Sequence, residues 1–224
     1  MKKSLLHLAG VWAVLCMLVA CGDDNEAYDP YANWQARNAE YFSQVASQAR
    51  LAIAQAKAAY GDSWEEHCEW RMFKSYHKPQ GVAGALTDSI CVHIEHKGEG
   101  RGCPMYSDSV RVNYRGTLMS TQYMENGELK TKEQVFSQSF TGEPDLPVLE
   151  ATAAPALMGV SSAVYGFATA LQYMHVGDAW RVYMPSELGY GATASGAIPA
   201  FSTLTFYIHL VDYYLPGTGV PGWQ

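Results

Sequence analysis

The chain has 224 residues, of which 48% are hydrophobic, and a formal net charge of -7. This length suits one ordinary globular domain with extensions. An acidic chain without a clustered stripe of Lys and Arg has no electrostatic footprint for nucleic acid, so we exclude that partner and interpret the charge as a source of solubility.

The N-terminus has the pattern of an export signal. Lys2 and Lys3 are followed by an apolar run over 5–19. The run is shorter than the roughly 18–20 residues that a spanning helix needs, so it is typical of a secretory signal. It ends in Leu-Val-Ala before Cys21, which resembles the bacterial lipobox. We expect a lipoprotein signal peptide over 1–20 and diacylation of Cys21, because stable anchoring takes two acyl chains. A plain signal peptide and an uncleaved anchor are the alternatives.

Small and acidic residues follow Cys21, so 21–32 is expected to be a solvated tether. The chain is then an exported protein, lipid-anchored to a bacterial membrane. We expect the outer membrane, and leave open whether the periplasmic or the outer face carries it.

A helix is expected over 33–61. Between Trp34 and Tyr60, large or apolar residues recur every three to five positions, and Gly61 is a natural stop. The apolar stripe is narrow because many of its members are Ala. The helix could pack on its own domain, pair with a second helix, or serve as a stalk; we favour the first.

Of the five cysteines, Cys68, Cys91 and Cys103 lie beyond Cys21. Cys91 and Cys103 flank a glycine-rich turn and are the best candidates for a disulfide, while three free, buried thiols are equally expected. No spacing is typical of zinc, because His93 and His96 on an expected strand point to opposite faces. We therefore predict no metal site.

From 67 to 214 the pattern changes to short strands around one short helix. Alternating runs cover 90–96, 110–115, 180–184 and 204–210, with a further strand expected over 69–76. Residues with helical spacing lie between 164 and 177. Residues 119–134 form a polar insertion with an Asn126-Gly127 turn signal, and 215–224 form a flexible tail. The fold class predicted is α+β, with a sheet wrapped around one short helix and preceded by an N-terminal helix.

Three stretches in the same register resemble the FKBP family. They are Val-Asn-Tyr-Arg-Gly-Thr-Leu at 112–118, Val-Phe-Ser-Gln-Ser at 135–139, and Gly-Phe-Ala-Thr-Ala-Leu-Gln-Tyr-Met-His-Val-Gly at 166–177. The third continues through Tyr190-Gly191 and Ile198-Pro199 into Thr-Leu-Thr-Phe at 203–206. The resemblance spans about 68–213. It implies a twisted antiparallel sheet and the cofactor-free cis/trans isomerisation of X-Pro bonds (a rotamase) in polypeptide substrates.

The resemblance also implies a role for individual residues. Tyr114, Phe136 and Phe206 would be catalytic walls of an apolar pocket, with Tyr190 donating its hydroxyl to a substrate carbonyl. Substrate would also be bound by Phe167 as the floor, where the family usually has Trp, by the Val164 backbone N–H, by Ile198 as a cap, and by Ser137 at the edge.

Ser137 is the main departure from the family, whose motif has Asp directly after this Phe. Ser carries no charge, so the rate of turnover is in question. Three hypotheses follow: an isomerase that assists the folding of exported proteins, a binding chaperone or adaptor with weak or no activity, and a structural accessory. The retained pocket residues argue against the third, because a spacer needs no open slot. We favour the first.

Overall fold

The computed structural model describes residues 29–126 and 128–223. The predicted signal peptide over 1–20, the lipidation site Cys21 and most of the 21–32 tether lie outside these residues. Among the helices of the described ranges, none is both long enough and apolar enough to cross a membrane.

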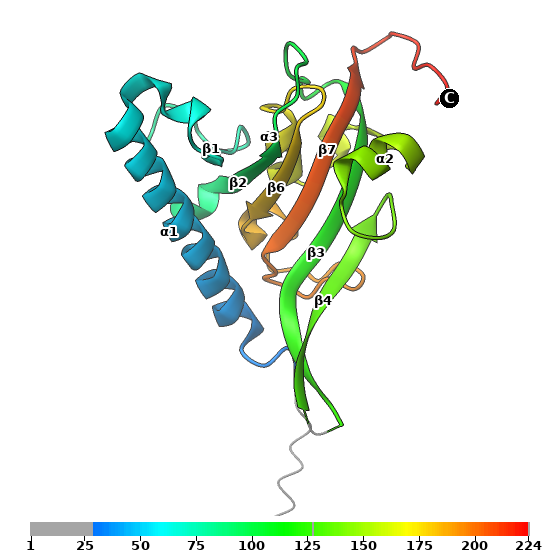
Figure 1. The fold of residues 1–224 in the computed structure, drawn as a ribbon. Helices are drawn as coiled ribbons and strands as arrows, with labels where there is room; N and C mark the ends of the chain where they lie inside the picture. Colours follow the sequence, from blue (N-terminus) through cyan, green and yellow to red (C-terminus); the bar gives the residue numbers. More distant parts are fainter. Residues whose placement is uncertain (1–28, 127, 224) are drawn as a thin grey trace, which may run out of the picture.

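The strands form one antiparallel sheet (Figure 1). The strands are β1 (Trp70–Lys74), β2 (Ser89–His96), β3 (Ser109–Glu125), β4 (Glu128–Gln138), β5 (Ala156–Gly159), β6 (Ala179–Met184) and β7 (Leu204–Tyr214). Their order is β1-β2-β6-β7-β3-β4, and β5 pairs with the first part of β3. The helices are α1 (Trp34–Tyr60), α2 (Leu146–Thr152) and α3 (Tyr165–Leu171), with short 3-10 turns η1 (Gly61–Glu66), η2 (Leu86–Asp88), η3 (Val160–Ser162) and η4 (Ser186–Leu188). The predicted α+β class is confirmed.

The inner face of the sheet wraps around α3. Because side chains alternate along a strand, Val112 on β3, Val182 on β6 and Ile208 on β7 all point to this face. They are fully buried together with Phe167 and Leu171 of the helix. The strand alternation read from the sequence therefore gives the main core.

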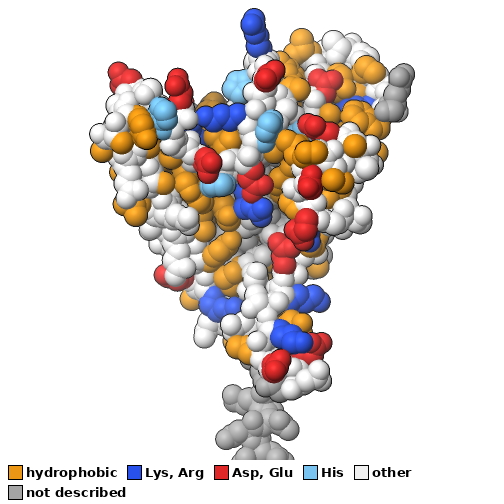
Figure 2. Space-filling model, viewed as in Figure 1, with side chains coloured by type: hydrophobic (Ala, Val, Ile, Leu, Met, Phe, Trp, Pro, Cys, Tyr) orange, Lys and Arg blue, Asp and Glu red, His pale blue; other side chains and the backbone are white. Residues whose placement is uncertain are grey.

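Helix α1 packs against the opposite, outer face, beside β1, β2 and β6 (Figure 1). Phe42 and Ala46 of the helix contact Cys91 of β2, and Trp70 and Tyr183 pack around the same cluster. The structure thus shows α1 docked on its own sheet, the arrangement favoured from the sequence. The space-filling view of this side shows acidic and basic side chains mixed over the surface rather than gathered by sign (Figure 2).

The first turns of α1 are also tied to the segment that leads into β7. The Trp34 indole Nε1–H donates to Ser202 Oγ at 2.9 Å, and Trp34 is part of the main core. Asn38 Oδ1 accepts from the Thr203 N–H at 2.8 Å, and the Thr203 hydroxyl donates to the Asn38 carbonyl at 3.0 Å. These buried bonds join the helix to the sheet at a defined register.

The polar insertion predicted over 119–134 is a continuation of the sheet. β3 and β4 extend as a two-stranded hairpin, with pairing up to Glu125 opposite Glu128. Asn126 adopts a left-handed φ of 53°, as expected of a turn residue, while Gly127 lies outside the described residues. Few side chains of this hairpin are buried, so its sequence lacks the alternation of apolar and polar residues that would mark the strands.

Two elements in 141–159 were not predicted. Helix α2 is capped by Asp145, whose Oδ1 accepts from the Val148 N–H at 3.2 Å. Its Leu149 is buried against Phe140 and Tyr207 on the outer face. Strand β5 is made of Ala-Leu-Met-Gly, and Ala is depleted in strands. The alanine-rich stretch therefore gave no strand signal.

The proposed disulfide is not present. Cys68, Cys91 and Cys103 are all free thiols. Cys91 lies buried beneath α1, whereas Cys103 is half-buried with its Sγ 3.8 Å from Nε2 of His175. A bridge would need Cys91 to leave the packed interface with α1, so of the two expectations the free thiols are correct.

Candidate functional site

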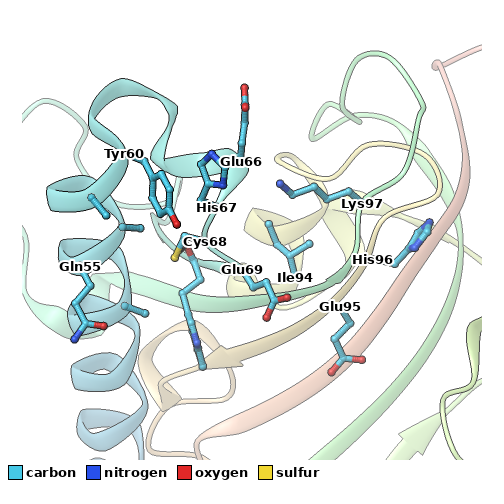
Figure 3. A pocket seen from close by; sticks show the side chains of 14 residues that line it. Gln55, Tyr60, Glu66, His67, Cys68, Glu69, Ile94, Glu95, His96 and Lys97 are labelled. Carbon is cyan, nitrogen blue, oxygen red and sulfur yellow. Dashed lines mark hydrogen bonds between the residues drawn. The ribbon is translucent and has the colours of Figure 1, made fainter.

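A cavity of about 670 Å³ lies between the second half of α1 and strands β1 and β2 (Figure 3). Its walls carry Glu66, Glu69 and Lys97, and the Tyr60 ring is stacked on His67 at 3.9 Å between centroids. Within 29–126 and 128–223, no group of three or more His, Cys, Asp or Glu side chains could hold a metal ion. Charges of both signs line this cavity, so it is not an apolar slot.

A second cavity, of about 520 Å³, opens on the inner side of the sheet beside α3. It is lined by every pocket residue predicted from the sequence: Tyr114, Phe136, Ser137, Val164, Phe167, Tyr190, Ile198 and Phe206. These residues come from β3, β4, α3, β7 and two loops. The fold thus brings residues separated by up to 92 positions, 114 to 206, to one site.

The walls of this cavity are rings that meet edge to face. Phe206 lies 5.0 Å from Phe167 and 5.4 Å from Phe136, with interplanar angles of 84° and 89°. Tyr114 meets Phe167 at 6.0 Å and 87°. Edge-to-face packing is the favoured arrangement for aromatic pairs, so the rings support one another as a rigid slot. Phe167 is buried at the floor.

Gly116 on β3 makes this ring packing feasible. A Cβ at this position would lie 2.6 Å from Cζ of Phe136 and 2.6 Å from Cε1 of Phe206. Its φ is not left-handed, so the glycine is required by space and not by backbone conformation. The absence of a side chain lets two pocket rings approach the strand.

At the edge of the pocket, Ser137 forms a hydrogen bond with Tyr114. Ser137 Oγ and the Tyr114 hydroxyl are 3.0 Å apart, and either oxygen can be the donor. The main chain of Tyr114 is held as well, because its N–H donates to Ser139 Oγ at 2.9 Å and its carbonyl accepts from the Ser139 N–H at 2.9 Å. A neutral pair therefore occupies the edge where the family motif has a carboxylate.

Two hydrogen-bond donors have no protein acceptor in the part of the chain that the structure describes. The Val164 N–H precedes the first turn of α3, and the Tyr190 hydroxyl lies in the loop between β6 and β7. Tyr190 is 40% exposed, although it lines the cavity. Both groups are free to donate to carbonyl oxygens of a bound chain.

Ile198 is held over the pocket by its own loop. Its N–H donates to the Ser195 carbonyl at 3.0 Å, and its carbonyl accepts from the Ser195 N–H at 2.9 Å. The hydroxyl of Ser202 donates to the Pro199 carbonyl at 2.6 Å while accepting from Trp34. Helix α1 therefore braces the loop that covers the pocket.

The sequence missed the small residues and the methionine of the lining: Met158, Ser162, Ala163, Ser195, Gly196 and Ala197. Met158 lies on strand β5, which was not predicted. The other five residues are Ser, Ala or Gly, and such small residue types carry no pattern of their own. Proximity to Val164 and Ile198 along the chain was the only available signal.

The site has no Asp, Glu, His, Lys or Arg among its described lining residues. It offers an apolar slot of aromatic rings, neutral hydroxyls and two free donors. It can desolvate and orient a polypeptide segment.

Comparison with known proteins agrees with this geometry. Residues 101–211 match the family model described as FKBP-type peptidyl-prolyl cis-trans isomerase. That segment contains the whole aromatic cavity, from Tyr114 to Phe206. Residues 101–211 therefore form a domain of the FKBP-type peptidyl-prolyl cis-trans isomerase type.

Similar curated proteins carry consistent names. The FKBP-type 22 kDa peptidyl-prolyl cis-trans isomerase of Escherichia coli is 32% identical over 136 residues, covering 60% of this chain and 54% of the relative. The outer membrane protein MIP of Legionella longbeachae is 32% identical over 162 residues, covering 71% and 60%. The macrophage infectivity potentiator of Trypanosoma cruzi is 25% identical over 150 residues, covering 66% and 65%. The chain thus spans 54% to 65% of the length of these relatives.

Among solved structures, the crystal structure of FkpA from Escherichia coli is 24% identical, with a TM-score of 0.43, covering 81% of this chain and 70% of that one. A peptidyl-prolyl cis-trans isomerase from Pseudomonas syringae pv. tomato is 24% identical, with a TM-score of 0.42, covering 76% and 94%.

Proposed function

We propose that this protein is a peptidyl-prolyl cis-trans isomerase that assists the folding of exported proteins. The observation that carries the proposal is the aromatic cavity, which has no Asp, Glu, His, Lys or Arg among its described lining residues and has two donors without a protein acceptor. The substrate class is a proline-containing polypeptide, and no cofactor enters the mechanism.

The chemistry explains why such a cavity would suffice. Rotation about an amide breaks its resonance across a barrier of about 18–20 kcal/mol. The planar amide has the larger charge separation, so water favours it over the twisted form. Transfer to the slot formed by Phe136, Phe167 and Phe206 removes that preference, and each factor of ten in rate needs only about 1.4 kcal/mol of differential stabilisation.

The donors would fix the chain while the amide turns. The Val164 N–H would hold one substrate carbonyl and the Tyr190 hydroxyl another, with Ile198 closing the slot. Because these groups are neutral, they orient the substrate without stabilising a charged intermediate. Catalysis would then come from desolvation and orientation, with the proline ring against Phe167.

The pair formed by Ser137 and Tyr114 supports a second candidate. With a hydroxyl 3.0 Å from the Tyr114 oxygen in place of a carboxylate, the edge of the pocket carries no charge. Should that charge matter for the twisted amide, the protein would act as a chaperone or adaptor that binds proline-containing segments with weak or no isomerase activity.

We also propose the cellular setting and the domain layout. Residues 1–20 would be a lipoprotein signal peptide, Cys21 the lipidated residue, 21–32 a tether, 33–61 a helical extension, 67–214 the isomerase domain and 215–224 a tail. The protein would be held at a bacterial membrane by its lipid. One relative, from Legionella longbeachae, is named an outer membrane protein, which supports export to that membrane.

The experiment that tests the function is an X-Pro isomerisation assay on the chain from Gly22 onward, with Tyr190→Phe and Ser137→Asp. Acceleration by the wild type that is reduced several-fold in Tyr190→Phe supports the enzyme. The Tyr190→Phe change removes one hydroxyl and keeps the ring, so it tests the donor alone.

An inert wild type would reject the first candidate. Ser137→Asp then separates the remaining cases: activity gained in this variant, with peptide binding already present in the wild type, supports the binding chaperone. If neither the wild type nor Ser137→Asp accelerates isomerisation, and neither binds a proline-containing peptide, the slot is closed.

A further inference from the structure

A further cavity, which we call the tyrosine cavity, lies on α3 apart from the aromatic slot and is walled by exposed tyrosines. It has a volume of about 330 Å³ and is lined by Ser75, Tyr76, His77, Tyr106, Tyr165, Ala168, Thr169 and Gln172. Tyr76, Tyr106 and Tyr165 are 48%, 49% and 39% exposed. Neither the family motifs nor the slot accounts for this grouping of rings at the surface.

The rings are anchored, not loose. Tyr165 is stacked on His77 with centroids 3.5 Å apart. Tyr76 is stacked on Tyr173 at 5.0 Å, and Tyr173 is stacked on Phe73 at 4.0 Å. The stack therefore runs from the core to the surface. Rigid tyrosines with one free face offer large contact area at a small entropic cost, which is why they are enriched at recognition sites.

Buried hydroxyls fix the floor of this cavity. Ser75 Oγ and Thr169 Oγ1 are 2.9 Å apart, and both residues are almost fully buried. This bond joins the segment after β1 to α3. The position of Tyr76 and His77 relative to the helix is therefore set by the fold, and the cavity does not depend on a mobile loop.

The cavity adjoins the aromatic slot through α3 and the turn before it. Val164 and Phe167 line the slot, whereas the neighbouring Tyr165 and Ala168 line the tyrosine cavity. Consecutive Cα atoms are about 3.8 Å apart, and successive side chains of a helix diverge by about 100°. An extended polypeptide covers roughly 3.3 Å per residue, so we take two to four residues, roughly 7–13 Å, as the length of chain that would link the two cavities.

We propose that this cavity is a subsite for an aromatic side chain of the same polypeptide whose proline occupies the slot. The inference rests on the proposed function, and it names the substrate class: proline segments with an aromatic residue two to four positions away. The described lining contains no carboxylate, ammonium or guanidinium group, so an uncharged ring is the side chain it fits. The Gln172 Nε2 already donates to the Ala168 carbonyl at 3.0 Å, which leaves its Oε1 as an acceptor for the peptide backbone.

The test uses labelled proline peptides of one Gly/Ser background with a single Phe placed two, three or four residues before or after the proline. Binding is measured by fluorescence anisotropy for the chain from Gly22 onward. At one or more placements, Phe should raise the affinity about five- to tenfold over Ser, the range expected for an added aromatic contact. Tyr76→Ala and Tyr165→Ala should each abolish this difference.

The matched control is Tyr60→Ala. Tyr60 is 49% exposed and is stacked on a histidine, His67, as Tyr165 is on His77, but it lies at the other cavity beside α1. This variant should retain the Phe preference. Equal affinities for all peptides, or a preference that survives in both Tyr76→Ala and Tyr165→Ala, overturns the subsite.

The same peptides separate this inference from the proposed function. Isomerisation without any Phe preference refutes the subsite and leaves the enzyme in place. A Phe preference that depends on Tyr76 and Tyr165, with no isomerisation, keeps the subsite and rejects the enzyme. Absence of both binding and isomerisation rejects both.

Discussion

Substitution of Gly116 by Ala should damage the pocket more than it damages the fold. The new Cβ would lie 2.6 Å from a carbon of Phe136 and 2.6 Å from a carbon of Phe206. Ordinary carbon contacts are about 3.5–4.0 Å, so the two rings must retreat by about 1 Å. Because Phe206 is itself wedged against Phe167, the displacement cannot be confined to one side chain.

The expected magnitudes follow from that displacement. Overpacking by one methyl group costs about 1–3 kcal/mol of stability. A misplacement of about 1 Å among groups that position a substrate costs up to about 100-fold in activity. We therefore expect a 10- to 100-fold fall in kcat/KM for X-Pro isomerisation, or a comparable loss of peptide affinity, with cooperative unfolding retained.

Gly166→Ala is the matched control. Its Cβ would lie 2.6 Å from Sδ of Met184, a residue that is buried in the core but is not part of the pocket lining. Stability is measured by urea unfolding, and activity by the isomerisation assay. Should Gly116→Ala lose no more activity than Gly166→Ala at similar stability, the rings do not shape the site and the reasoning is refuted.

Three further predictions concern the rest of the molecule. Asn38→Ala should destabilise the fold by about 1–3 kcal/mol in urea unfolding, because it leaves the buried N–H of Thr203 unpaired; an unchanged midpoint would contradict this. Burial lowers the pKa of His209 below its usual 6.5, against a smaller opposing effect of a nearby carboxylate. As pH falls, the unfolded chain therefore binds this proton before the folded chain does. The free energy of unfolding is unaffected by His209 above pH 6.5 and declines as pH falls below it. His209→Gln should reduce that decline when unfolding is measured as a function of pH. Burial raises the pKa of the Cys91 thiol to about 12, so a thiol reagent should label the half-buried Cys103 first in the native protein and Cys91 only on unfolding; equal labelling rates would refute this.

The fold and the candidate pocket could be read from the sequence where burial imposes a pattern. Val182 and Ile208 belong to strands with one buried face, so the alternation survives in the residue types. The pocket rings lie at fixed distances along the chain from the Tyr-Gly and Ile-Pro motifs, and the family register assigned Phe136 and Tyr190 to a common site. Periodicity alone would have placed Phe136 in an ordinary core.

Other features depend on contacts that no local pattern encodes. The docking of α1 is specified by Trp34 and Asn38 meeting the segment before β7, at sequence separations of 168 and 165 residues. The strand β5 is recognised only from its pairing with β3, because its composition disfavours strands. The start of α2 did carry a signal, an Asp followed by a Pro in the first turn, which the alanine-rich context obscured.

The place of β7 in the sheet has a consequence for how the chain folds. It is the last of the described strands along the sequence, yet it lies between β6 and β3 in the middle of the sheet. Until residues 204–214 are available, β1, β2 and β6 form one half-sheet and β3, β4 and β5 another, with no strand to join them. Such non-local closure is slow, and it requires nearly the whole domain to be synthesised first. A partly made chain therefore keeps its two half-sheets apart until the last strand is present.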